Sequence, residues 1–366
     1  MGGHHTGTVA AVKPPRLAYI DYLRVTATVF VIFGHTVTVA RTYAAPGTLL
    51  FQVLEIFNFI FSSSNLMFLM ISGALLLPVR GERLQDFFSH RFSKVLIPML
   101  VYYILYVCAK EGVGQLAPGN WGLMLKRIIS GPPVEAPHFW LVYVIIWLYV
   151  LTPFLRYLMQ NIPDTVMNGV MLVIFLVCAF DTYTPLFGVN LHLSGIVDTF
   201  VGVFILGYFI AVRSSRRAEN ILLAGGIISF FITVYIITNL GWYDDYIYNN
   251  APTMMLFAAA QFVLVKRIAA GEVHTPKVVR LIGKYSYSIL LIHWGVLHFG
   301  VKQVLHVDVM MGGVWGGCIL MAALTFVGSF AGAVILDYTL ILWVRKGISA
   351  IASLLRSITG KLKSRT

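Results

Sequence analysis

Long blocks of apolar residues alternate with short polar segments along almost the whole chain. Each block is about twenty residues long, the length at which a helix crosses the hydrocarbon core of a bilayer. The sequence shows no alternating ten-residue pattern of the membrane-barrel type. The pattern therefore predicts an all-α integral membrane protein with about ten transmembrane helices in one bundle. The predicted spans are 17–40, 50–78, 92–110, 137–158, 166–181, 195–212, 220–240, 251–268, 283–304 and 313–344.

The fifth predicted span is the shortest. It is bounded by Pro163 and Pro185, and proline interrupts the hydrogen bonding of a helix. A segment of this kind can be tilted, partly re-entrant or joined to its neighbour. The sequence leaves these alternatives, and the helix count between residues 160 and 195, open.

The composition excludes an ordinary soluble domain, because 58% of the residues are hydrophobic and 11% are charged. With the N-terminus inside, 21 of the 27 Lys and Arg residues lie on the cytoplasmic side, five lie on outer loops, and Arg24 lies within the first span. Since a cytoplasmic excess of these residues sets the direction of insertion, both termini are expected in the cytoplasm. This bias, with attraction to anionic lipid headgroups, accounts for the net charge of +12, and no nucleic-acid partner is expected.

The chain is expected to contain one transmembrane domain, residues 17–344. Residues 1–16 are predicted to be a disordered cytoplasmic leader, and residues 345–366 a basic amphipathic tail on the inner membrane surface. The three cysteines lie within spans or at their ends. Neither a disulfide framework nor a thiolate metal site is therefore expected.

Arg24 and His35 lie inside the first span, where ionisable side chains are costly and usually functional. Eleven residues of helix place them on one face, about 16 Å apart, so they do not pair and need separate roles. A guanidinium suits a phosphate, and an imidazole can remove a proton from a hydroxyl. A phosphate-bearing donor that reaches a hydroxyl acceptor would use both. The structural alternative is that Arg24 extends to the interface and His35 hydrogen-bonds a neighbouring helix.

Several motifs resemble those of the membrane acyltransferase-3 family of O-acetyltransferases, and the resemblance covers nearly the whole chain. The most specific is the segment from Tyr19 to Arg24, followed after ten residues by His35, which is similar to the family's Arg-x10-His motif. The other similar segments, in the family's order, are Phe68 to Gly73, Arg91-x-x-Lys94-x-x-x-Pro98, His138 to Pro153, and Gly283 to His293.

The resemblance implies transfer of an acyl group, usually acetyl from acetyl-CoA, to a hydroxyl of a carbohydrate or glycoconjugate. The donor would come from the cytosol, and the acceptor would lie at the outer face of the bacterial inner membrane. No metal is expected. The identity of the acceptor, a larger donor such as succinyl-CoA, and the oligomeric state stay open.

The resemblance also implies roles for individual residues. His35 is expected to be the general base or a proton relay, and Arg24, Arg91 and Lys94 to hold the phosphates of coenzyme A. The family commonly has Arg where this chain has Lys94, and an ammonium lacks the bidentate fork of a guanidinium. A covalent acyl-enzyme on Ser72 is not required. Ser72 lies far from His35 along its span, and Ser-Gly pairs usually serve helix packing.

Three further polar residues flank these positions. Asp21 lies one helical turn before Arg24 and is expected to orient its guanidinium. Glu55 and Asn58 lie one turn apart near the outer start of the second span, where they would bind a sugar hydroxyl or orient His35. The alternative for both is an ordinary solvated loop boundary.

Other candidate substrate-binding residues lie later in the chain. His293, in the middle of the ninth span, is either an interhelical hydrogen-bonding residue or, from its place in the family pattern, a second site residue. His138 and Trp140, with the aromatic outer loop 242–248, would stack on a sugar ring. An ordinary interfacial aromatic belt is the alternative for these aromatics.

A carrier or flippase is the competing functional class, because a bundle with buried Arg and His residues can move an anionic or glycosylated substrate without chemistry. The sequence shows no inverted repeat and no paired broken helices, which counts against a carrier. A purely structural membrane protein is a third class. It does not explain Arg24 and His35 within one span.

Overall fold

The computed structural model describes residues 17–79, 81–189, 199–243, 246–249, 251–271 and 275–363. Within these residues every regular element is a helix and no strand is present, so the predicted all-α fold is confirmed. The predicted leader 1–16 lies outside the described residues, as do Asp244 and Asp245 of the outer loop.

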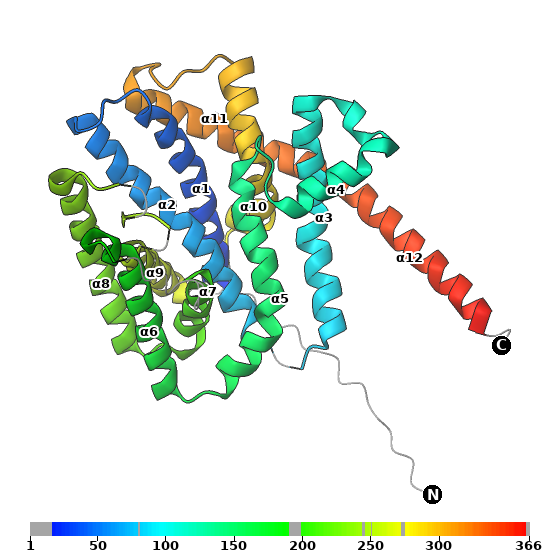
Figure 1. Ribbon diagram of the computed structural model, residues 1–366, viewed down its shortest axis with the longest axis horizontal. Helices are drawn as coiled ribbons and strands as arrows, with labels where there is room; N and C mark the ends of the chain where they lie inside the picture. Colours follow the sequence, from blue (N-terminus) through cyan, green and yellow to red (C-terminus); the bar gives the residue numbers. More distant parts are fainter. Residues whose placement is uncertain are drawn as a thin grey trace, which may run out of the picture.

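Twelve labelled α-helices follow one another along the described chain, with short 3₁₀- and π-helical segments between or after them (Figure 1). The α-helices are α1 (Ala18–Arg41), α2 (Leu49–Leu76), α3 (Leu84–Glu111), α4 (Trp121–Ser130), α5 (Trp140–Asn161), α6 (Asp164–Tyr183), α7 (Thr199–Tyr208), α8 (Arg216–Tyr235), α9 (Pro252–Ile268), α10 (Lys277–Gly295), α11 (Gly313–Leu336) and α12 (Leu342–Lys363). The 3₁₀-helices are η1 (Val113–Leu116), η2 (Pro118–Asn120), η3 (Pro137–Phe139), η4 (Thr184–Phe187) and η9 (Ala269–Gly271). The π-helices are η6 (Phe209–Arg213), η7 (Ile236–Leu240), η10 (Val296–Val304) and η11 (Asp337–Ile341).

The described chain is that of a multi-pass membrane protein, because eight of its helices are long and apolar enough to cross a bilayer. One of the eight runs from Asp164 to Phe187, so the short segment predicted at 166–181 reaches full spanning length. The predicted spans 195–212 and 283–304 correspond to a shorter apolar helix, Phe200–Arg213, and to α10 with η10, which are not among the eight.

Helices α1 and α2 form the centre of the bundle (Figure 1). They pack against each other, and α10 and α11 contact α1, whereas α7 and α5 contact α2. A Cβ on Gly73 of α2 would lie 1.8 Å from the carbonyl oxygen of Phe204, and one on Gly207 of α7 would lie 2.0 Å from that of Met70. Only glycine permits this approach, so the packing expected of the Ser-Gly pair is observed at Gly73.

The structure differs from the predicted boundaries in three places. Helix α3 begins at Leu84 rather than at residue 92. The segment after α3, predicted as an outer loop, contains the amphipathic helix α4. This helix has only ten residues, so it is too short to cross a bilayer. Helix α12 crosses the predicted tail boundary at residue 345 and extends away from the bundle (Figure 1). Its location on the membrane surface stays a prediction.

Candidate functional site

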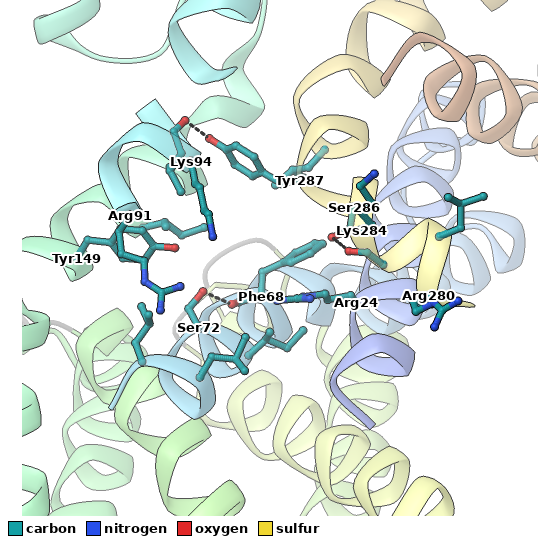
Figure 2. A pocket seen from close by; sticks show the side chains of 18 of the residues that line it. Arg24, Phe68, Ser72, Arg91, Lys94, Tyr149, Arg280, Lys284, Ser286 and Tyr287 are labelled. Carbon is teal, nitrogen blue, oxygen red and sulfur yellow. Dashed lines mark hydrogen bonds between the residues drawn. The ribbon is translucent and has the colours of Figure 1, made fainter. Parts of the chain in front are cut away.

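A cavity of about 960 Å³ opens between α1, α2, α3, α5 and α10. Six cationic side chains line it, and none of the described residues that line it carries a carboxylate. Figure 2 shows Arg91 and Lys94 on one side and Arg24 and Arg280 on the other. We call this the basic cavity. Its cations are Arg24, Arg91, Lys94, Lys277, Arg280 and Lys284, and its other walls include Phe68, Ser72, Tyr149 and Tyr287.

Two of these cations have different partners: Arg24 lies near a carboxylate, whereas Lys284 hydrogen-bonds to phenol hydroxyls. The guanidinium of Arg24 lies 3.7 Å from the carboxylate of Asp21, which is itself buried on α1. The ammonium of Lys284 donates to the hydroxyls of Tyr285, at 3.1 Å, and Tyr338, at 3.5 Å. Asp21 therefore constrains Arg24 within the cavity, whereas Lys284 is committed to two phenols.

Arg91 presents an unsatisfied donor. Its Nε atom is buried and has no hydrogen-bond partner in the described part of the chain. A buried donor without a partner costs about 1–3 kcal/mol. An anionic ligand in the basic cavity would remove this cost, because phosphate oxygens accept hydrogen bonds from guanidinium groups.

Three histidines from separate elements meet beyond this cavity. The rings of His35 on α1 and His293 on α10 are stacked, with centroids 5.1 Å apart. The ring of His138, from η3, lies 4.8 Å from that of His293. Trp294 contacts His35 edge to face at 5.0 Å, and His298 packs against Trp294 at 4.2 Å. We call these five residues the histidine cluster.

Backbone carbonyls fix the orientation of two of these rings. Nδ1 of His293 lies 2.7 Å from the carbonyl oxygen of Leu290, and Nε2 of His138 lies 3.2 Å from that of Leu291. A carbonyl only accepts, so both ring nitrogens donate. The other ring nitrogens, Nε2 of His293 and Nδ1 of His138, are buried without a hydrogen-bond partner in the described structure.

Exposure distinguishes His35 from the other two histidines. His138 and His293 are buried, whereas His35 is partly exposed. No carboxylate of the described chain lies within ion-pair distance of His35; its ring contacts are with His293 and Trp294. Among the described residues, no group of three or more His, Cys, Asp or Glu side chains is placed to hold a metal ion. Of the three histidines that meet, His35 is the one whose residue is not fully buried; His298, which packs on Trp294, is also partly exposed.

Tyr106 of α3 hydrogen-bonds to the backbone of α10 beside the cluster. Its hydroxyl donates to the carbonyl of Leu291 at 3.1 Å and accepts from the N–H of Gly295 at 2.8 Å. Gly295 is the last residue of α10 before the π-helix η10 begins. One phenol thus bridges the backbone on both sides of His293 and Trp294, where the helix changes its hydrogen-bonding pattern.

A second cavity of about 350 Å³ is lined on α1 by Thr38 and Arg41, which follow His35 along the helix. Its lining combines side-chain amides and hydroxyls with aromatic rings, and Trp140 contacts Phe200 at 5.5 Å. We call it the amide cavity. It is lined by Thr38, Arg41, Asn58, Ser62, Asn65, Leu66, Trp140, Phe200, Tyr248, Asn249 and Met254.

A hydrogen-bonded network fixes one wall of the amide cavity. The buried carboxylate of Glu55 accepts from both Arg41 and Tyr248. Asn58 donates to the hydroxyl of Tyr248 at 2.8 Å, and its side-chain oxygen accepts from Thr38 at 3.3 Å. Burial, with the adjacent carboxylate, raises the pKa of Tyr248, so this phenol keeps its proton. The positive charge of Arg41 is compensated locally by Glu55.

The candidate residues from the sequence divide among these three places. Arg24, Ser72, Arg91 and Lys94 line the basic cavity; His35, His138 and His293 meet in the histidine cluster; Asn58 and Trp140 line the amide cavity. Asp21 and Glu55 line neither cavity and instead contact the arginines that do.

Two expectations about grouping differ from the structure. His138 and Trp140 were expected on one sugar platform, but His138 contacts His293 in the histidine cluster and Trp140 lines the amide cavity. Glu55 was expected to bind sugar or orient His35, and it instead contacts Arg41 and Tyr248. The hydroxyl of Ser72 donates to the carbonyl of Phe68 at 3.0 Å and lies with the basic cavity, not with the histidines.

The sequence did not single out several residues that these sites contain. Lys277 and Arg280 were counted only as cytoplasmic charges, although their i, i+3 spacing puts them on one helical face. Trp294 follows His293 directly, and Tyr106 lies within the third predicted span, where nothing in the sequence marks it. Tyr248 was considered only with the aromatic outer loop 242–248, not as a partner of Glu55 and Asn58. Their roles depend on contacts between helices far apart in the sequence.

A family model described as an acyltransferase domain matches residues 17–338, which include both cavities and the histidine cluster. No curated protein and no solved structure matches the chain.

Proposed function

The chain belongs to the acyltransferase-3 family of membrane proteins, and we propose that it moves an acyl group from a cytosolic acyl-CoA to a hydroxyl of a carbohydrate or glycoconjugate. Acetyl is the proposed acyl group. The acceptor would lie on the outer side of a bacterial inner membrane. The protein would therefore be an O-acyltransferase whose donor and acceptor enter from opposite faces.

One observation carries this proposal: a single helix connects all three parts of the site. Helix α1 contributes Arg24 to the basic cavity, His35 to the histidine cluster, and Thr38 and Arg41 to the amide cavity. Since residues of a helix advance by 1.5 Å each, these groups lie in this order across the membrane. A donor at one end and an acceptor at the other would meet near His35.

The basic cavity has the chemistry of a phosphate site. Among the residues that the structure describes, none that lines this cavity carries a carboxylate, and the buried Nε of Arg91 has no hydrogen-bond partner. Coenzyme A carries a diphosphate and a ribose 3′-phosphate, which such a cavity would bind through charge-assisted hydrogen bonds. The volume of about 960 Å³ falls at the upper end of the range for ligand pockets.

The amide cavity has the chemistry of a sugar site. Amides and hydroxyls supply donors and acceptors for sugar hydroxyls, and the ring of Trp140 supplies an apolar face. Because Glu55 compensates Arg41, the wall between them carries no net charge. This favours a neutral carbohydrate acceptor over an anionic one.

In the proposed reaction, His35 takes the proton of the acceptor hydroxyl. The oxygen then forms a bond to the acyl carbon of the thioester, and the carbon–sulfur bond breaks. The coenzyme A thiolate leaves and takes the proton back from His35. His35 is suited to this role because it lies on α1 between residues that line the two cavities and, unlike His138 and His293, is not a fully buried residue.

The test is release of free coenzyme A from acetyl-CoA in membranes that contain the native acceptor, with donor binding to the purified protein measured separately. His35→Ala should lose turnover by about 100-fold or more and keep donor binding, since general base catalysis contributes about this much. His90→Ala, an exposed histidine near the start of α3, is the matched control and should keep both. Turnover retained in His35→Ala would refute the assigned role.

A carrier would also have cavities on two faces, and the same measurement separates the two functions. A carrier moves labelled acyl groups or glycans across the membrane without releasing free coenzyme A. Transport by the wild type with no turnover would replace the acyltransferase proposal.

A further inference from the structure

Lys277 and Arg280 are two cations of the basic cavity that the family motifs do not cover. Both lie at the start of α10 and both are exposed. We propose that these two side chains bind the ribose 3′-phosphate of the coenzyme A donor, apart from the site that holds the diphosphate. This inference rests on the acyl-CoA donor proposed above and assigns one of its phosphates.

The cations of the basic cavity lie at different depths along the helices. Helices α1 and α10 pack together, and a Cβ on Gly283 would lie 3.4 Å from the carboxylate of Asp21. Gly283 therefore lies level with Asp21, one turn before Arg24. Arg280 and Lys277 precede Gly283 by three and six residues, so they lie about 4.5 Å and about 9 Å closer to the start of α10.

The cations on α3 lie deeper. The hydroxyl of Tyr287 donates to the carbonyl of Val95 at 2.9 Å, so the turn of α3 that ends at Lys94 lies beside the part of α10 that follows Gly283. Arg91 and Lys94 reach into the cavity from this turn, on the side opposite Arg280 (Figure 2). The basic cavity thus has one pair of cations on α10 near its mouth and a deeper set that includes Arg24.

The order of chemical groups in the donor decides which phosphate meets which set of cations. The pantetheine arm separates the thioester from the diphosphate, and the 3′-phosphate lies on the ribose beyond the diphosphate. With the thioester directed along α1 toward His35, the diphosphate comes to the level of Arg24 and Arg91. The 3′-phosphate then lies nearest the mouth, where Lys277 and Arg280 are.

Lys284 does not compete for this role, although it belongs to the same helix and cavity. Its ammonium donates to Tyr285 and Tyr338 and lies 4.7 Å from the centre of the Tyr285 ring. It therefore adds charge to the cavity without being directed at its mouth. This makes Lys284 a control for charge alone.

The experiment compares acetyl-CoA with 3′-dephospho-acetyl-CoA, two donors that differ by one phosphate. The readouts are donor affinity of the purified full-length protein and the KM and kcat of coenzyme A release. The wild type should bind acetyl-CoA at least tenfold more tightly than the dephospho donor. In the double variant Lys277→Gln, Arg280→Gln this ratio should fall about tenfold, through KM rather than kcat, because charge-assisted hydrogen bonds to one phosphate are removed.

Three controls sharpen the result. The swapped variant Lys277→Arg, Arg280→Lys keeps both charges and should keep the wild-type ratio, which also shows that this turn tolerates substitution. Lys284→Gln removes a charge from the cavity and should weaken both donors equally. Arg216→Gln removes an exposed cytoplasmic-side charge of α8 and should change neither.

The outcomes separate this inference from the proposed function. A wild type that binds acetyl-CoA but does not distinguish the two donors would overturn the 3′-phosphate assignment and leave the acyltransferase proposal intact. A double variant that keeps the wild-type ratio, or a Lys284→Gln variant that loses it, would do the same. A wild type that binds neither donor would refute the proposed donor itself, and the assignment with it.

Discussion

Leu66 and Phe68 lie two residues apart on α2, yet Leu66 lines the amide cavity and Phe68 lines the basic cavity. Two residues of helix span about 3 Å. Both side chains are buried, with 1% and 8% of their surface exposed. The two side chains point to nearly opposite faces of the helix, so α2 itself forms the barrier between the two cavities at this level. The proposed acyl transfer would take place across this barrier.

Replacing Phe68 should weaken that barrier. Phe68→Ala is expected to let water reach the bound thioester and to raise coenzyme A release in the absence of acceptor. The variant should also lose about 3–5 kcal/mol of stability, because a buried aromatic ring is removed. Phe68→Leu, which keeps most of the volume, is the control for folding. Acceptor-free release measured for both proteins tests the role of the ring; an unchanged rate in a folded Phe68→Ala protein would show that Phe68 is not the barrier.

Tyr106 should matter for turnover because of its hydroxyl alone. Tyr106→Phe leaves the N–H of Gly295 without its partner and frees the backbone that carries His293 and Trp294. We expect a loss of about 1–3 kcal/mol in unfolding free energy, together with a reduced kcat and little change in the KM for donor. Thermal unfolding and initial rates measure the two effects.

The matched control for Tyr106 is Tyr143→Phe. The hydroxyl of Tyr143 donates to the carbonyls of Ile128 and Gly131, at the end of α4 and away from the histidines. This variant should lose stability but keep kcat. If the two variants reduce kcat equally, Tyr106 has only a structural role.

Eight of the ten predicted spans correspond to helices of spanning length in the described chain, because each depends on local composition. The length and apolarity of a segment decide whether it can cross a bilayer, and these are visible without neighbours. The pairing of Arg24 with Asp21 could be anticipated for the same reason, since both lie on one helix. The short helix α4 was missed because it is too brief to register as a span.

The assembly of the site could not be predicted in this way. His35, His138 and His293 meet only because α1, η3 and α10 pack together, and no local pattern encodes that contact. Glu55 illustrates the same limit, since nothing in its own segment indicates burial beside Arg41 and a tyrosine from the loop before α9. Long-range packing decides which polar groups of a bundle face each other.

The crossing of α2 and α7 should tolerate no side chain at its closest point. Gly73→Ala places a Cβ 1.8 Å from the backbone oxygen of Phe204, so one helix has to move. We expect a loss of about 1–3 kcal/mol or more, the usual cost of overpacking. Gly169→Ala is the control, because a Cβ there meets nothing within 4 Å and alanine favours the helix. Thermal unfolding of both variants in detergent provides the measurement, and equal midpoints would contradict the packing argument.

Tyr248 should make the stability of the protein depend on alkaline pH. Burial and the carboxylate of Glu55 raise its pKa above the ordinary value of 10.0, so in the folded protein it keeps the proton that it donates to Glu55. Above pH 10.0, the ordinary pKa, the unfolded chain binds fewer protons at this tyrosine than the folded protein does. The contribution of Tyr248 to the free energy of unfolding is therefore complete below pH 10.0 and falls as the pH rises above it. Tyr248→Phe lacks this dependence. Unfolding midpoints of the two proteins from about pH 8 to about pH 11 should therefore differ most at the lower end and converge at the upper end. A constant difference would mean that Tyr248 does not retain its proton in the folded state.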